Sequence, residues 1–219
     1  MIKAITAALL LSLSMTAFAQ PSPEEIAEWR AAADKGEAWA QSNLGQMYDR
    51  GDGVPQDSAV AMKWWTKAAE QGYAKAQYNL ALMYADGEGV PKDNATAVKW
   101  YTKAAEQGYA DAQLNLGLMY DNGLGVPQDD ATAVKWYTKA AEQGVASAQS
   151  NLGLMYARGE GVPKDEVMAY MWWSLAAAQG DEGAQGNKGI DQERMTPAQI
   201  AEAQTLSREC LAKDYKDCG

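Results

Sequence analysis

The sequence predicts an all-α protein, an α/α superhelical solenoid of about four 36-residue helical hairpins with a capping helix at each end. Three observations predict this fold. Glycine recurs every 36 residues from Gly36 to Gly180 without a gap. Apolar positions within each unit recur at three and four residues, the period of an amphipathic helix. Helix breakers fall at the same two places in every unit, so each unit should contain two helices.

Other residues keep a fixed place in the repeat. The first unit contains Ala40-Gln41, Asn43, Met47 and Trp64, and the same types return in phase in the later units. A fixed period in this range is typical of stacked supersecondary units. We therefore predict four repeats, over residues 37–72, 73–108, 109–144 and 145–180.

The turns of the first unit explain its division into two helices, which we expect over about 38–49 and 57–71. Gly51 can adopt the left-handed conformation that ends the first helix, Pro55 blocks its continuation, and Asp57 can cap the second. The connector Gly-x-Gly-Val-Pro-x-Asp is repeated, which predicts one hairpin shape throughout; its later copies begin at Gly87, Gly123 and Gly159.

Tryptophans lie at helical spacing with alanines in the second helix of each unit, as Trp64 and Trp65 do with Ala61 and Ala68. We interpret them as packing residues, because alanine on a neighbouring helix lets an indole approach closely. An aromatic ligand box is the alternative interpretation, but the spacing is simply helical.

The N-terminus has the features of a secretory signal. Lys3 provides a positive start, residues 4–15 are an apolar run, and Ala-Phe-Ala at 17–19 fits a signal-peptidase site. We expect residues 1–19 to be removed, so that the mature chain begins at Gln20. The apolar run is shorter than the roughly 20 residues that span a bilayer, so we expect no stable membrane insertion and a periplasmic or secreted location.

The two ends of the solenoid should differ from its middle, because terminal repeats need a polar outer face. We expect residues 20–36 to form a capping helix, with Trp29 in register with Trp65. Residues 181–219 should contain a degenerate repeat and a C-terminal cap, whose final helix begins near Thr196.

Cys210 and Cys218 are the two cysteines of the chain, and in an exported protein oxidation is their default state. We expect a disulfide that stabilises the C-terminal end by roughly 2 to 3 kcal/mol. Free thiols for redox or metal chemistry are the alternative, but two thiolates without histidine make an incomplete zinc site.

Charge and composition argue against several functions. The formal net charge of −10 repels phosphate backbones, so we expect no nucleic-acid partner. The chain has no histidine, the commonest general base and zinc ligand. We find no serine-hydrolase or penicillin-recognising motif in the mature chain. We therefore predict no catalytic residues, no metal site and no cofactor. The Gly-x-Gly pairs are turns, since a helix precedes each of them.

Three motifs recur together, for example at 112–120 (Ala-x-x-Asn-Leu-Gly-x-Met-Tyr), 123–129 (Gly-x-Gly-Val-Pro-x-Asp) and 133–144 (Ala-Val-Lys-Trp-Tyr-x-Lys-Ala-Ala-Glu-Gln-Gly). In these motifs the chain resembles an exported bacterial member of the Sel-one-like repeat (SLR) family, a tetratricopeptide-like solenoid, over roughly 24–180. The segment 194–200 is similar to the closing segment of bacterial members. The resemblance implies an adaptor that binds another protein, in envelope signalling or in host and cell-surface contact.

The four copies can also be compared with one another. Four positions of the first helix change between copies and lie within about 80° of one another, opposite the constant Gln41, Leu44 and Tyr48. We call these positions the variable stripe and predict that they bind the partner on a concave face. The predicted partner-binding residues are Trp39, Ser42, Gln46, Arg50, Lys75, Tyr78, Asp86, Asp111, Leu114, Asn122, Ser147, Ser150 and Arg158.

Two questions stay open at this point. Leu82, Leu118 and Leu154 belong to the variable stripe but are nearly constant, so they either line the groove or pack between repeats.

Two other functions also stay possible. One is hydrolysis of a β-lactam or peptidoglycan fragment, because some cysteine-rich relatives carry a β-lactamase label. The other is a cell-wall glycan module that stacks sugars on Trp39 and Tyr78.

Overall fold

The computed structural model describes residues 21–218, so the predicted signal peptide lies outside the described part of the chain. Residues 21–218 form helices and no strands. None of the helices there combines the length and the apolar character needed to cross a membrane. The helices are α1 (Pro23–Asp34), α2 (Ala38–Arg50), α3 (Ser58–Glu70), α4 (Ala74–Asp86), α5 (Asn94–Glu106), α6 (Ala110–Asn122), α7 (Asp130–Ala141), α8 (Ala146–Arg158), α9 (Glu166–Ala178), α10 (Glu182–Gln192) and α11 (Pro197–Ala212).

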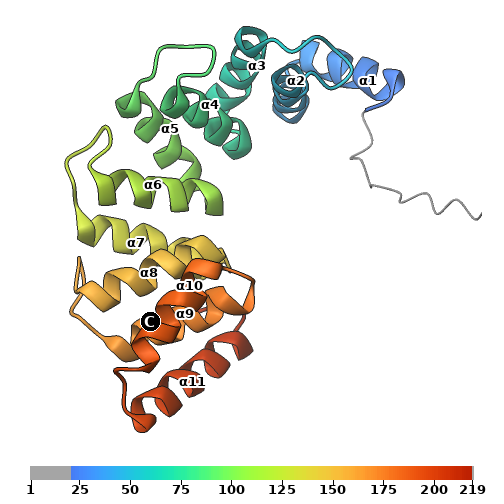
Figure 1. Ribbon diagram of the computed structural model, residues 1–219. Helices are drawn as coiled ribbons and strands as arrows, with labels where there is room; N and C mark the ends of the chain where they lie inside the picture. The colour runs from blue at the N-terminus through green and yellow to red at the C-terminus, as the bar shows by residue number, and fades with distance from the viewer. Residues whose placement is uncertain (1–20, 219) are drawn as a thin grey trace, which may run out of the picture.

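Helices α2 to α9 form four successive hairpins, and each hairpin packs against the next. We call the first helix of each hairpin (α2, α4, α6, α8) the A helix and the second (α3, α5, α7, α9) the B helix. Figure 1 shows the hairpins stacked along a curved path from α1 to α11. This arrangement confirms the predicted all-α solenoid.

The hairpin turn uses the predicted residues. Gly51 has a φ of 75°, and its N–H donates to the Met47 carbonyl at 2.9 Å, which ends α2. The Asp57 carboxylate accepts a hydrogen bond from the Val60 N–H at 2.9 Å and so caps α3. The Asp57 N–H donates to the Tyr48 carbonyl at 2.8 Å, which closes the loop onto the A helix. These short links fix the hairpin angle.

In three of the four repeats an aromatic side chain of the B helix packs against a glycine on the A helix. Trp65 is buried against Gly45, where an added Cβ would come within 2.4 Å of the indole. The neighbouring residue Trp64 is only half-buried, and the Lys67 ammonium lies 4.5 Å from its ring centroid. We expected alanine to allow the close approach of the indole, but at this contact the facing residue is glycine.

A buried glutamine links each repeat to the preceding helix. Gln113 donates to the Ala105 carbonyl at 3.0 Å, near the end of the preceding B helix. It accepts from Gln143 Nε2, at the end of its own B helix, at 2.7 Å. Gln41, Gln77 and Gln149 make the same pair of bonds in the other repeats. These bonds satisfy buried polar groups at every junction between repeats.

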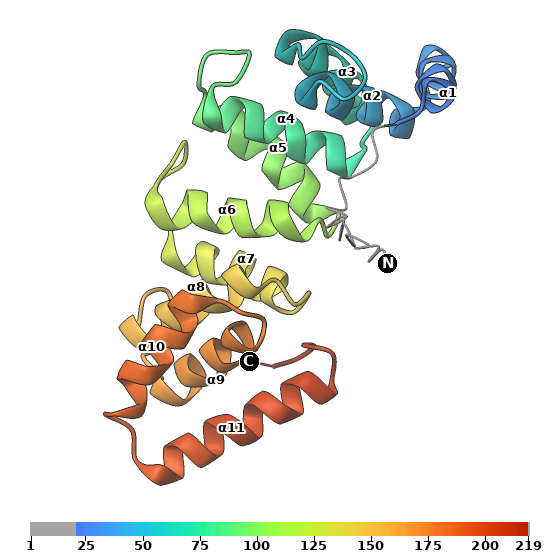
Figure 2. The ribbon, with the colours of Figure 1, turned by 45° about the vertical axis from the view of Figure 1, so that its right-hand side comes forward.

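The C-terminal end departs from the hairpin pattern. Helix α11 packs against α9 and does not pair with α10, and Figure 2 shows it beneath α9 at the end of the stack. Thr196 caps α11 by accepting from the Gln199 N–H. Cys210 and Cys218 form the predicted disulfide, with an S–S distance of 2.03 Å. This end is therefore a cap rather than a fifth hairpin.

Candidate functional site

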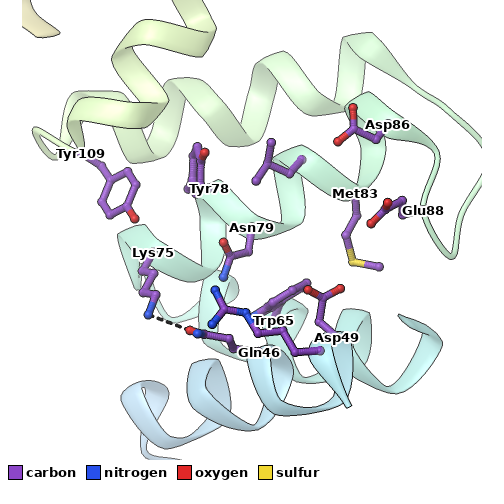
Figure 3. Close-up of a pocket in the computed structure, with 12 residues that line it drawn as sticks. Gln46, Asp49, Trp65, Lys75, Tyr78, Asn79, Met83, Asp86, Glu88 and Tyr109 are labelled. Carbon is purple, nitrogen blue, oxygen red and sulfur yellow. Dashed lines mark hydrogen bonds between the residues drawn. The ribbon is translucent and has the colours of Figure 1, made fainter. Parts of the chain in front are cut away.

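A hollow of about 370 Å³ lies between the A helices of the first two repeats (Figure 3). Helices α2 and α4 form its two sides. The start of α6 and the loop after α4 add to its lining. Because the hollow joins two repeats, their stacking determines its shape. We call it the first hollow.

The structure brings together five predicted residues of the variable stripe in this hollow. Gln46 and Arg50 come from α2, and Lys75, Tyr78 and Asp86 come from α4. The Lys75 ammonium donates to Gln46 Oε1 at 2.9 Å, so the two repeats also make a direct polar contact here. The stripe is thus a continuous lining at this junction.

One end of the first hollow is acidic. Asp49, Asp86 and Glu88 gather there in Figure 3. Burial raises the pKa of the Asp49 carboxyl, and the negative charge of Glu88 raises it further, while Arg50 lowers it. Within residues 21–218 none of the three carboxylates forms a salt bridge. This end is therefore suited to a basic group from outside the chain.

The opposite end of the hollow is aromatic. The rings of Tyr78 and Tyr109 lie 5.1 Å apart between centroids at an angle of 37°. Burial raises the pKa of the Tyr78 hydroxyl, and the nearby charge of Asp111 raises it further. Both phenols are partly exposed, so they offer apolar surface together with a hydrogen-bonding group.

Among the lining residues that were not predicted to bind a partner are Asp49, Asn79, Glu88 and Tyr109. Asp49, Glu88 and Tyr109 differ between copies of the repeat, but they lie outside the four helix positions that were compared. Comparing every position of the repeat would have found them. Asn79 lies in the hollow but is constant in the repeats, so a comparison of copies could not single it out.

Other predicted residues lie outside the first hollow. Trp39 is 40% exposed on the first turn of α2. Leu114 is half-buried and packs against the core of the last repeats. The remaining members in this group are exposed on α6 or α8, and they are Asp111, Asn122 and Ser147.

Two serines of the predicted stripe have a packing role. Ser42 is fully buried, and its carbonyl accepts from Trp65 Nε1 at 3.1 Å. The Ser150 carbonyl accepts from Trp173 Nε1 at 3.0 Å in the same way. Serine therefore occurs at this position where the facing residue on the B helix is tryptophan. The residue type at this position thus changes with the facing aromatic ring. Ser42 cannot reach a partner at the surface, and we remove it from the stripe.

The three leucines left open have a mixed role. Leu82 is half-buried, packs against the core of the second and third repeats, and also lines the first hollow. Leu118 and Leu154 are half-buried against neighbouring cores. Leu82 thus belongs both to the hollow and to the contact between repeats.

Arg158 lies at a different place. It lines a second hollow of about 220 Å³ between α8 and α10, and it pairs with Glu160 at 3.6 Å.

Across residues 21–218 we find no group of three or more Cys, Asp or Glu side chains arranged to hold a metal ion.

Comparisons with known proteins identify the repeat. The Sel1 repeat matches residues 40–73, 74–109, 110–145 and 146–181. A crystal structure of a Sel1 repeat protein from Oxalobacter formigenes is 39% identical, with a TM-score of 0.72, over 75% of this chain and 68% of that one. Comparison with curated proteins gives no match.

A second solved structure is c5321, a protective antigen of uropathogenic Escherichia coli strains with an SLR fold. It is 30% identical, with a TM-score of 0.57, over 91% of this chain, which spans about half of that protein's length. Sel1 repeat proteins are generally scaffolds for protein–protein interactions. With four matched repeats that cover most of its length, the chain belongs to the Sel1 repeat family.

Proposed function

We propose that this protein is an exported scaffold that binds another protein along its A helices, on the concave face of the solenoid, with the first hollow as the principal contact. The observation that carries the proposal is the first hollow itself. Its acidic end forms no salt bridge within residues 21–218, and its opposite end holds a pair of half-exposed tyrosines. Aromatic residues are enriched at protein interfaces, and charged groups there provide electrostatic complementarity to the partner.

The lining indicates the chemistry of the partner. A basic side chain would meet the carboxylates of Asp49, Asp86 and Glu88, and an apolar side chain would pack on Tyr78 and Tyr109. A partner segment that carries a basic and an apolar residue a few positions apart can make both contacts. The amide of Asn79 lies in the same hollow and offers hydrogen bonds to an extended backbone.

Export is supported by the disulfide between Cys210 and Cys218, because such bonds persist in oxidising compartments. The signal-like N-terminus agrees with it. The partner would then be a protein of the periplasm, the cell surface or a host, which fits a role in envelope signalling or surface contact.

The experiment is crosslinking and mass spectrometry of the tagged mature protein in its native envelope fraction. The test variant carries Asp86→Lys and Glu88→Lys, which reverse the charge of the acidic end. We expect one protein to be crosslinked to the parent and at least a tenfold loss in the variant.

A matched control carries Glu70→Lys and Glu106→Lys. These exposed residues end the B helices α3 and α5, so the net charge changes equally while the first hollow stays intact. The control variant should still be crosslinked to the partner protein. Equal loss in both variants would mean that only net charge matters, and undiminished capture by the test variant would contradict the proposed site.

A further inference from the structure

The second hollow stands at the same place in the repeat as the first hollow, three repeats further along the chain. Helices α8 and α10 form it, as α2 and α4 form the first. The equivalence extends to single residues, because Arg158, Trp173 and Ile190 occupy the positions of Arg50, Trp65 and Leu82.

One exchange between the two hollows is unexpected. Asp191 lines the second hollow at the position of Met83, and it is also buried, with 8% of its surface exposed against 3% for the methionine. Its Oδ2 atom accepts no hydrogen bond from any residue between 21 and 218. A buried carboxylate oxygen without a partner is costly, so its presence needs an explanation.

The surroundings of Asp191 only partly offset this cost. It lies at the C-terminal end of α10, where the helix dipole disfavours a negative charge. Burial raises the pKa of its carboxyl, Glu166 raises it further, and Arg194 and Lys164 lower it. Lys164 is itself paired with Glu166 at 3.0 Å.

Arg194 provides the second half of a site. It is exposed, lines the same hollow, and forms no salt bridge within residues 21–218. Asp191 and Arg194 therefore line one cavity as an anion and a cation that do not approach each other closely enough to pair. A ligand that carries both charges, separated by a few bonds, would be complementary to them.

We propose that the second hollow binds a short peptide with free ends, of about dipeptide size. The ammonium group of the ligand meets Asp191, and its carboxylate meets Arg194. The volume of about 220 Å³ limits the occupant to a small molecule or a chain end. This site does not depend on the first hollow, so the proposal can be tested independently of the proposed scaffold function.

A stability measurement separates this proposal from a purely structural role. Asp191→Met places in α10 the residue that the second repeat already buries at this position. If Asp191 is kept for a ligand, the substitution should raise Tm by about 2 to 4 °C, because a buried unpaired charge is removed. A lower Tm would overturn the proposal, since it would mean that Asp191 stabilises the fold through Arg194.

A binding measurement completes the test. Isothermal titration of the mature protein with the dipeptide alanylalanine should give saturable binding in the millimolar range or below. N-acetylation or C-amidation of the dipeptide should each weaken binding at least tenfold, as should Asp191→Met and Arg194→Gln. Glu70→Gln, at an exposed carboxylate that ends α3, should leave binding unchanged. Absence of binding, or equal binding of the blocked dipeptides, would overturn the proposal.

Discussion

In the regular repeats each A helix is held by a buried glutamine and by a small residue that faces an aromatic ring. Helix α10 has the same residue types at the equivalent positions, but they do not make these contacts. Gln185 stands where Gln113 stands in the repeat, yet it is exposed. Gly189 stands where Gly45 stands, but an added Cβ would meet nothing within 4 Å among residues 21–218. The same residue types therefore stabilise the fold only where a B helix of the same hairpin covers them.

The glutamine link gives the largest expected contrast. Gln113→Ala should lower the free energy of unfolding by about 3 kcal/mol, because the Ala105 carbonyl and the Gln143 amide lose a partner inside the stack. Urea unfolding followed by circular dichroism measures the loss. Gln185→Ala is the matched control and should change the stability by less than about 0.5 kcal/mol. Similar losses in the two variants would refute the contrast.

The disulfide should act only at the C-terminal end. Reduction of Cys210–Cys218, which are eight residues apart, should destabilise α11 by roughly 2 to 3 kcal/mol in the chain-entropy model. Amide hydrogen exchange should become faster in α11 and remain slow in α4 to α7. If exchange also accelerates in the central repeats, the cap and the repeats unfold together.

The facing glycine should give an effect of intermediate size. Gly45→Ala should destabilise the protein by about 2 kcal/mol, since the new methyl group overlaps Trp65. Ala81 already occupies the equivalent position of the second repeat, where it faces the smaller ring of Tyr101. Gly45→Ala combined with Trp65→Tyr should therefore recover part of the loss, and thermal unfolding of both variants tests this.

The smallest effect should have the opposite sign. Gly189→Ala in α10 should stabilise the protein by up to about 1 kcal/mol, because alanine favours the helix and the space beside Gly189 is open. Differential scanning calorimetry should show a small rise in Tm. A fall in Tm would mean that α10 is covered as tightly as the other A helices.

The fold could be predicted because its signals are local and repeated. Gly51, Pro55 and Asp57 mark the ends of the helices by backbone chemistry alone, and the observed α2 and α3 agree with the expected ranges to within one residue. The replacement of a fifth hairpin by α11 packed on α9 could not be predicted in detail, because it depends on tertiary contacts of a segment that has lost the repeat.

The candidate site was predictable only in part. Lys75 lines the first hollow, and it was selected because its position changes between copies. Tyr78 also lines the hollow, although its position is that of Ser42 and varies with the facing aromatic ring. Ser42 was included wrongly, since its change follows the exchange of the facing Trp65 for tyrosine in other repeats. Asn79 was missed because a residue with one role in every repeat looks the same as a structural residue when copies are compared.

The most direct test of the scaffold function places a photo-crosslinking amino acid at Gln46, inside the first hollow, and separately at Lys63, exposed on the B helix α3. Both variants are irradiated in the native envelope, and the crosslinked products are identified by mass spectrometry. We predict that Gln46 crosslinks one specific protein and that Lys63 does not. Equal crosslinking from both positions, or crosslinking from Lys63 alone, would contradict the assignment of the binding face to the A helices.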